Sequence, residues 1–246
     1  MSARLEALVR LMAVQASYTY ERMAGIGVGH AATPLLRDVF AARPARERRE
    51  AIARSADFFN SHPYLAGVAV GAVVKAERDG LPGLVISRLR TALSGPLGSL
   101  GDQLIWAGWV PALIGITLIA APSLGIWAIV ALLVVHNTLR VWISAWGLDL
   151  GLREGLGVGA ALQRSWLPLG ALEAQRAAAL AVGAALPIVA SRVLTPATST
   201  AAAAAVAAGI IGAALTVVPA TRSRITGLRL GLVFVGLAVI AAGVLR

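Results

Sequence analysis

Residues 103–139 read QLIWAGWVPALIGITLIAAPSLGIWAIVALLVVHNTL and contain no charged side chain. A helix needs roughly 20 apolar residues to cross the hydrocarbon core of a bilayer, so this stretch is long enough for two crossings. Pro122 and Ser123 interrupt it near its middle, where a proline kinks or ends a helix. The stretch therefore predicts two membrane helices joined by a tight turn.

The composition also predicts a membrane protein. Hydrophobic residues make up 58% of the 246 residues and charged residues 14%, which is too apolar for an ordinary soluble domain. Further uncharged runs at 177–191, 193–221 and 230–245 raise the expected number of membrane helices to about five. We therefore expect an all-α integral membrane protein that is multi-pass and surrounded by membrane lipid.

Charge is concentrated in the first 100 residues, which hold 13 of the 22 basic and 8 of the 12 acidic side chains. We expect an amphipathic and re-entrant region at 1–100 and a transmembrane helical region at 101–246, together one membrane unit. A net charge of +10 beside long apolar runs is typical of cytoplasmic loops near anionic headgroups. Because the aromatic and basic interleaving of a stacking platform is missing, we expect no nucleic-acid partner.

The N-terminus is expected to stay in the cytoplasm, because charges interrupt the first 30 residues and no secretory signal is present there. Apolar residues recur at helical spacing over 5–23, which predicts an amphipathic helix on a membrane or partner. A short helix is expected over 34–40, opened by its proline. The charged stretch at 43–54 predicts a solvated helix after a turn at Pro44.

Residues 63–74 read PYLAGVAVGAVV and are apolar but only 12 residues long. A helix of that length is too short to cross a bilayer, so a re-entrant or protein-buried half-helix is expected. Such an element usually lines a pathway, because backbone at that depth must be satisfied by protein or by a water-filled cavity.

Two polar clusters lie in the N-terminal region. The first, QASYTYERM at 15–23, contains Gln15 and Glu21 and is either an interfacial aromatic belt or part of a site. The second places Asn60, Ser61 and His62 directly before the half-helix, where Asn60 or Ser61 could simply cap it. Alternatively, an amide and an imidazole beside free helical N–H groups supply the mixed donors and acceptors that sugar hydroxyls require.

A third cluster, LSGPLGSLGD at 93–102, reads as a glycine-rich turn that places Asp102 at the mouth of the first apolar stretch. Asp102 is either the N-cap of that helix or an acid that binds substrate or pairs with an arginine. Within the second membrane helix, His136, Asn137 and Arg140 need polar partners.

The sequence offers no pattern for covalent catalysis. It has no cysteine, which excludes a disulfide framework, a thiolate metal site and a phosphocysteine. His136 has no second histidine or carboxylate at ligand spacing, and no GxSxG or HExxH motif is present. We therefore expect no metal, no cofactor and no catalysis by this chain itself.

Four stretches in this order resemble the IID membrane subunit of the mannose, fructose and sorbose family of phosphotransferase permeases. They are QASYTYERMAGIG (15–27), ARSADFFNSHPYLAGVAVG (53–71), LSGPLGSLGDQLIW (93–106) and HNTLRVWISAWGLDLGLREG (136–155). The resemblance implies a subunit that works with a IIC partner to take a hexose-type sugar across the inner membrane. In that scheme a IIB component phosphorylates the sugar with a phosphoryl group that it receives from IIA. The IID subunit carries no phosphorylated residue.

With this resemblance, Asn60, His62 and Asp102 become the expected sugar-binding residues, with Gln15 and Glu21 as second choices. The sequence departs from the family where Lys75 replaces an acid, where Gln103 follows Asp102, and where Val110 precedes a proline. The C-terminal third is also short and rich in alanine. These departures leave open a transport-inactive homologue that serves as a regulatory or scaffolding membrane subunit.

Overall fold

The computed structural model describes residues 1–194, except the side chains of Pro187, Ala190 and residues 191–194. The chain divides into two compact units, Met1–Ala184 and Ala185–Arg246, and the arrangement given below is that of the first. All named elements of the described residues are helical. The expected helices within 193–221 and 230–245 lie almost wholly outside the described residues.

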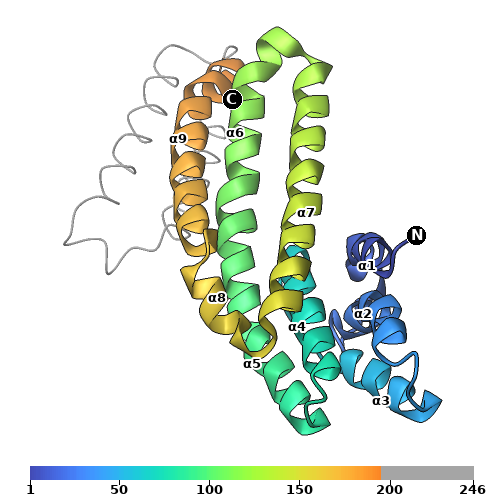
Figure 1. Cartoon of the computed structure of the whole chain (residues 1–246). Coiled ribbons are helices and arrows are strands. Elements are labelled where there is room, and N and C mark those ends of the chain that lie inside the picture. Colours follow the sequence, from blue (N-terminus) through green and yellow to red (C-terminus); the bar gives the residue numbers. More distant parts are fainter. Residues whose placement is uncertain (195–246) are drawn as a thin grey trace, which may run out of the picture. The chain divides into compact units, whose positions relative to one another are not determined.

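A long helical hairpin contains the uncharged stretch. Helix α5 (Gly83–Gly101), the π-helical segment η3 (Asp102–Trp109) and α6 (Val110–Leu124) are continuous, and α7 (Ile126–Glu154) runs back beside α6 (Figure 1). The hairpin turns at Gly125, whose φ of +55° favours glycine. The helical stretches Gly83–Leu124 and Ile126–Leu186 each contain an apolar run long enough to cross a membrane. The expected pair of apolar helices and the tight turn between them are thus confirmed. The break at Pro122 and Ser123 was wrong, because Pro122 lies inside α6 and the turn falls at Gly125.

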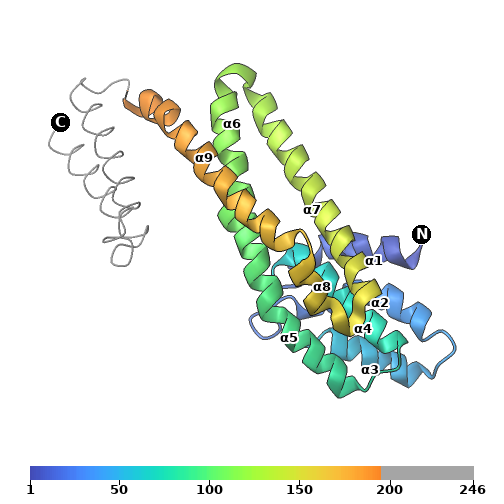
Figure 2. The same cartoon turned by 60° about the vertical axis from the view of Figure 1, so that its left-hand side comes forward.

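The segment after the hairpin returns along it. Chain direction changes at η4 (Gly155–Gly157) and α8 (Val158–Arg164), after which α9 (Leu167–Leu194) passes η3 and α6 (Figure 2). Helix α9 begins ten residues before the uncharged run at 177–191. Glu173 and Arg176 lie in this added stretch and pair with each other on its exposed surface at 2.6 Å.

Three helices precede the half-helix: α1 (Ala3–Met12), α2 (Gly25–Val39) and α3 (Ala45–Ser55), with the short 3₁₀ turn η1 (Val14–Ser17) after α1. The expected helix over 5–23 is too long, because α1 ends at Met12. Helix α3 begins after Pro44, as expected.

Pro34 lies inside α2 and does not open a helix, contrary to the expectation from sequence. Proline cannot donate a backbone hydrogen bond to the carbonyl four residues earlier, which here is that of His30. The side chain of Arg10 on α1 fills the gap, since its Nη1 donates to the His30 carbonyl at 2.9 Å. A tertiary contact thus replaces the hydrogen bond that Pro34 cannot donate.

The half-helix consists of η2 (Pro63–Leu65) and α4 (Ala66–Arg78), and its residues from 63 to 74 are buried. It packs closely on α7 through two Gly-xxx-Gly pairs, 67/71 on α4 and 147/151 on α7. A Cβ atom on Gly151 would lie 2.6 Å from the backbone nitrogen of Ala72 and closer still to the Val68 carbonyl oxygen. Small residues permit this close approach of two helix backbones, as in membrane helix pairs. The half-helix is thus buried in protein.

Candidate functional site

A cavity of about 690 Å³ forms where η1, the loop before η2, and the α5–η3 helix meet. It gathers polar side chains from three separate stretches of sequence. Its wall consists of Gln15, Tyr18, Asn60, Ser61, His62, Pro63, Ser94, Gly95, Gly98, Ser99, Asp102, Gln103 and Trp106. The structure therefore brings together four of the five expected site residues, Gln15, Asn60, His62 and Asp102.

Glu21 is the exception. It is exposed in the turn between η1 and α2 and is not part of the cavity wall. The expected helix over 5–23 would have placed Glu21 and Gln15 in one continuous helix. Because the chain turns after Ser17, the two side chains are separated by irregular backbone.

The loop before η2 leaves the Asn60 side chain free. The N-cap of η2 is His62, whose Nδ1 accepts a hydrogen bond from the Tyr64 backbone N–H at 3.3 Å. The expectation that Asn60 or Ser61 caps the half-helix was therefore wrong. The Asn60 amide is exposed and has no hydrogen-bond partner within residues 1–194, so both its donor and its acceptor are available.

His62 is 2% exposed and lies against two aromatic rings, with ring centroids 4.9 Å from Tyr64 and 5.8 Å from Trp106. Burial lowers the pKa of His62 to about 4, so the imidazole is neutral at pH 7. Since Nδ1 accepts a hydrogen bond, the proton lies on Nε2. In the described part of the chain this Nε2 is buried without a partner.

The lowered pKa of His62 predicts a loss of stability in acid. As pH falls below 6.5 the unfolded chain takes up a proton that folded His62 does not, so the free energy of unfolding decreases. We expect this decrease to total roughly 3 kcal/mol between pH 6.5 and about 4, and to be absent above pH 6.5. Denaturant midpoints measured across this range should fall in the parent, and fall much less in His62→Gln. An unchanged slope in that variant would contradict the assignment.

Asp102 lies in a continuous helix, so both the expected glycine-rich turn and the N-cap role of Asp102 were wrong. Leu93, Leu97 and Gly101 are buried at four-residue spacing, and this packing stabilises a helix through Gly95 and the following proline. Asp102 begins η3, where the ladder widens to i→i+5 bonds. Such π-helical turns are frequent at functional sites.

Tyr18, Ser94 and Trp106 also line the cavity, although the sequence did not single them out as site residues. Tyr18 donates its phenolic hydrogen to the Ser61 carbonyl at 3.4 Å. Burial, and secondarily the Asp102 carboxylate, raise the pKa of Tyr18. Sequence periodicity could have indicated Ser94 and Trp106, because both lie at four-residue spacing from Asp102 (94, 98, 102 and 106) and therefore share one helix face.

The cavity suits an uncharged ligand with many hydroxyl groups. Its wall offers an amide, an imidazole and a carboxylate for hydrogen bonds, and the indole of Trp106 for apolar contact. Asp102 is the one charged side chain of this wall. Within residues 1–194 no group of three or more histidine, aspartate or glutamate side chains could hold a metal ion.

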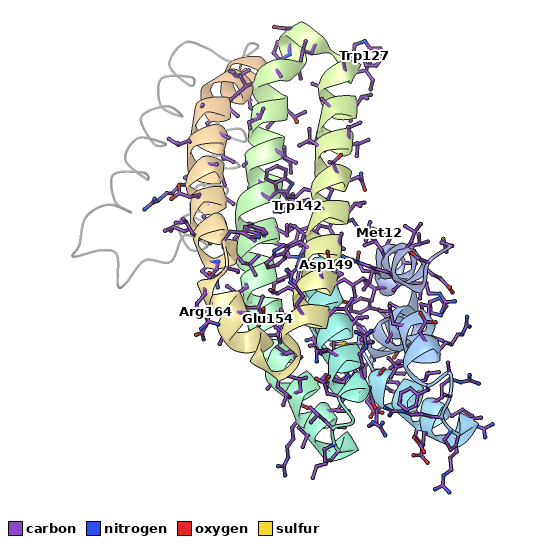
Figure 3. All side chains as sticks on the ribbon, in the orientation of Figure 1. Met12, Trp127, Trp142, Asp149, Glu154 and Arg164 are labelled. Atoms are coloured by element: carbon purple, nitrogen blue, oxygen red, sulfur yellow. The ribbon has the colours of Figure 1, made fainter. Side chains whose placement is uncertain are left out.

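A second polar cluster connects the half-helix to α7. The Tyr64 hydroxyl lies 2.8 Å from His136 Nε2, and the Arg140 guanidinium lies over the Tyr64 ring at 5.4 Å. Arg140 also donates to the carbonyl of Met12, which ends α1 beside α7 (Figure 3). Asn137 bonds to the Leu133 carbonyl at 2.8 Å. All three polar residues expected to need partners therefore have them.

Curated relatives match over part of the chain. The fructose permease IID component of Bacillus subtilis (strain 168) is 25% identical over 147 residues, which cover 58% of this chain and 53% of that protein. The sorbose-specific EIID component of Klebsiella pneumoniae is 26% identical over 149 residues, covering 58% and 54%. The mannose-specific EIID component of Escherichia coli (strain K12) is 24% identical over 149 residues, covering 58% and 52%. The chain thus spans about half the length of these relatives.

Two solved structures share the fold. One contains the mannose transporter ManYZ with microcin E492, at a TM-score of 0.56 and 22% identity, covering 75% of this chain and 69% of that chain. The other, described as a membrane protein, has a TM-score of 0.65 at the same identity and coverage. The family model for the mannose/fructose/sorbose IID component of the phosphotransferase system matches residues 2–187. With three quarters of its length matched, the chain belongs to this family of IID components.

Proposed function

We propose that this chain is the IID membrane subunit of a mannose-type sugar permease. With a IIC subunit it takes a hexose-type sugar across the cell inner membrane. A IIB component, which receives its phosphoryl group from IIA, phosphorylates the sugar. The chain itself catalyses no reaction. The observation that carries this proposal is the 690 Å³ cavity, which gathers uncharged hydrogen-bonding groups and one carboxylate from three distant stretches of sequence.

In this proposal Asn60, His62 and Asp102 contact the sugar, and Gln15 adds a further amide. The free Asn60 amide can donate and accept at once, and the buried Nε2–H of His62 is a neutral donor. Asp102 can accept from two hydroxyl groups, since an ionised carboxylate has two oxygens. Glu21 lies off this wall, so a role for it requires a surface that the IIC subunit completes.

We further propose that the N-terminal region enters the bilayer without crossing it, with the N-terminus in the cytoplasm. The half-helix is too short to span, is buried against α7, and begins at the cavity wall. These properties support a re-entrant element that lines the sugar pathway.

The departures from the family pattern within residues 1–194 do not favour a transport-inactive homologue. Lys75 pairs with Asp79 in the last turn of α4, and Val110 begins α6; neither is part of the cavity wall. Gln103 does line the cavity, where its amide donates to Ser99 Oγ at 3.0 Å. The departure nearest the site thus adds a polar group to it.

The test is reconstitution with the IIC subunit. Vesicles that contain both chains should take up a labelled hexose in a saturable manner, whereas vesicles with either chain alone should not. Addition of phosphorylated IIB should convert the entering sugar to its phosphate. If a correctly assembled pair took up none of a panel of hexoses, the proposed transport function would be wrong and the scaffolding alternative would be favoured.

A further inference from the structure

One face of α5 follows the loop that carries Asn60 and His62. Arg90 contacts the start of this loop, Ser94 its middle, and Gly101 its end. We propose that Arg90 is a positioning residue that holds the end of α3 and the loop from residue 56 to 62 in their ligand-binding shape. This inference rests on the proposed sugar site, and it adds a residue that lies outside the cavity wall.

Arg90 is built for this role by its burial and its partners. The side chain is 3% exposed, and its Nη2 donates to the carbonyls of Ser55 at 3.1 Å and Asp57 at 2.9 Å. Its guanidinium lies 5.5 Å from the centre of the Phe59 ring, which is fully buried. Arg90 thus fixes two carbonyls and one ring in the five residues that precede Asn60.

Ser94 continues the contact one helical turn further on. Its hydroxyl accepts from the Asn60 backbone N–H at 3.2 Å and donates to the Asn60 carbonyl. At Gly101 the absence of a side chain admits His62, because a Cβ atom there would overlap the His62 ring. Successive turns of α5 therefore hold successive residues of the loop, and Arg90 anchors the end remote from the cavity.

Replacing Arg90 by methionine should weaken sugar binding without touching the cavity. Two hydrogen bonds from a charged donor are lost, one of them to the carbonyl of the buried residue Ser55, so the loop is released at its start. We expect the half-saturating sugar concentration for uptake to rise about tenfold, with the maximal rate per assembled transporter changed much less. Arg90→Lys should recover only part of the affinity, since one ammonium cannot reproduce the planar guanidinium on the Phe59 ring.

Arg88→Met is the matched control. Arg88 is exposed on the same helix and has no hydrogen bond or ion pair within the described residues, so uptake by this variant should equal that of the parent. An equal loss in both variants would show a general effect of charge and would overturn the proposal.

A sugar-independent measurement guards against misfolding as an explanation. The chain has no cysteine, so a spin label can be attached at Phe58→Cys, an exposed position within the loop. Arg90→Met should increase the mobility of this label but not that of a label at Leu84→Cys, on α5 outside the loop. Unchanged mobility at residue 58 would overturn the positioning role. Absence of sugar uptake by the parent, with increased mobility in the variant, would instead refute the proposed function alone.

Discussion

Replacing Gly151 by alanine is expected to lower the free energy of unfolding by about 3 kcal/mol, although alanine is the better helix former. The added methyl group would meet the Val68 carbonyl and the Ala72 nitrogen, which are backbone atoms of α4. Backbone atoms cannot rotate away as a side chain can, so α4 and α7 must separate. Thermal unfolding of the purified protein in detergent, followed by the loss of helical signal, measures the effect.

Gly159→Ala is the control for this substitution. Gly159 lies in α8, and a Cβ atom there would meet no other atom within 4 Å. The same change should therefore leave the stability equal or raise it by up to about 1 kcal/mol through helix propensity. Equal behaviour of the two variants would show that the glycine contact between α4 and α7 does not limit stability.

Replacing Asn60 by alanine is expected to reduce sugar uptake, measured as maximal rate over half-saturating concentration, on the order of 100-fold. The variant loses a donor and an acceptor that have no partner within residues 1–194, so no internal hydrogen bond of the side chain is broken. The Ser94 contacts of Asn60 use its backbone and survive the change. Uptake into vesicles that contain this chain and its IIC partner measures the effect.

Gln163→Ala is the control for Asn60→Ala, because it also removes one side-chain amide. Gln163 is exposed on α8, outside the cavity wall, so uptake by this variant should match that of the parent. Parental uptake by Asn60→Ala, with normal assembly on the IIC subunit, would remove Asn60 from the site.

The sequence predicted the features that depend on polarity along the chain. The uncharged stretch at 103–139 was long enough to require two membrane crossings, and the 12 apolar residues after His62 were too few for one. Polarity also marked Gln15, Asn60, His62 and Asp102, four residues of the cavity wall, as candidates. The resemblance to the IID family was needed to choose sugar binding over helix capping. Patterns of this kind do not depend on which helices touch.

The features that sequence missed depend on tertiary contacts. Glycine and proline at 93–102 suggested a turn, but buried leucines on one face stabilise a helix there, and this placed Ser94 and Trp106 beside Asp102. The sequence does not show that the glycines of α4 and α7 pack against each other, because the two helices are far apart along the chain. Arg90 resembled any other basic residue near a membrane, and only its buried bonds to a distant loop distinguish it.

The contact between Arg10 and the His30 carbonyl makes Arg10 and Pro34 an epistatic pair. Loss of Arg10 should cost more stability while residue 34 is a proline, because any other residue there would supply the missing N–H itself. The ion pair of Arg10 with Glu6 is lost in either case. Substitutions at the two positions should therefore not be additive in their effect on the free energy of unfolding.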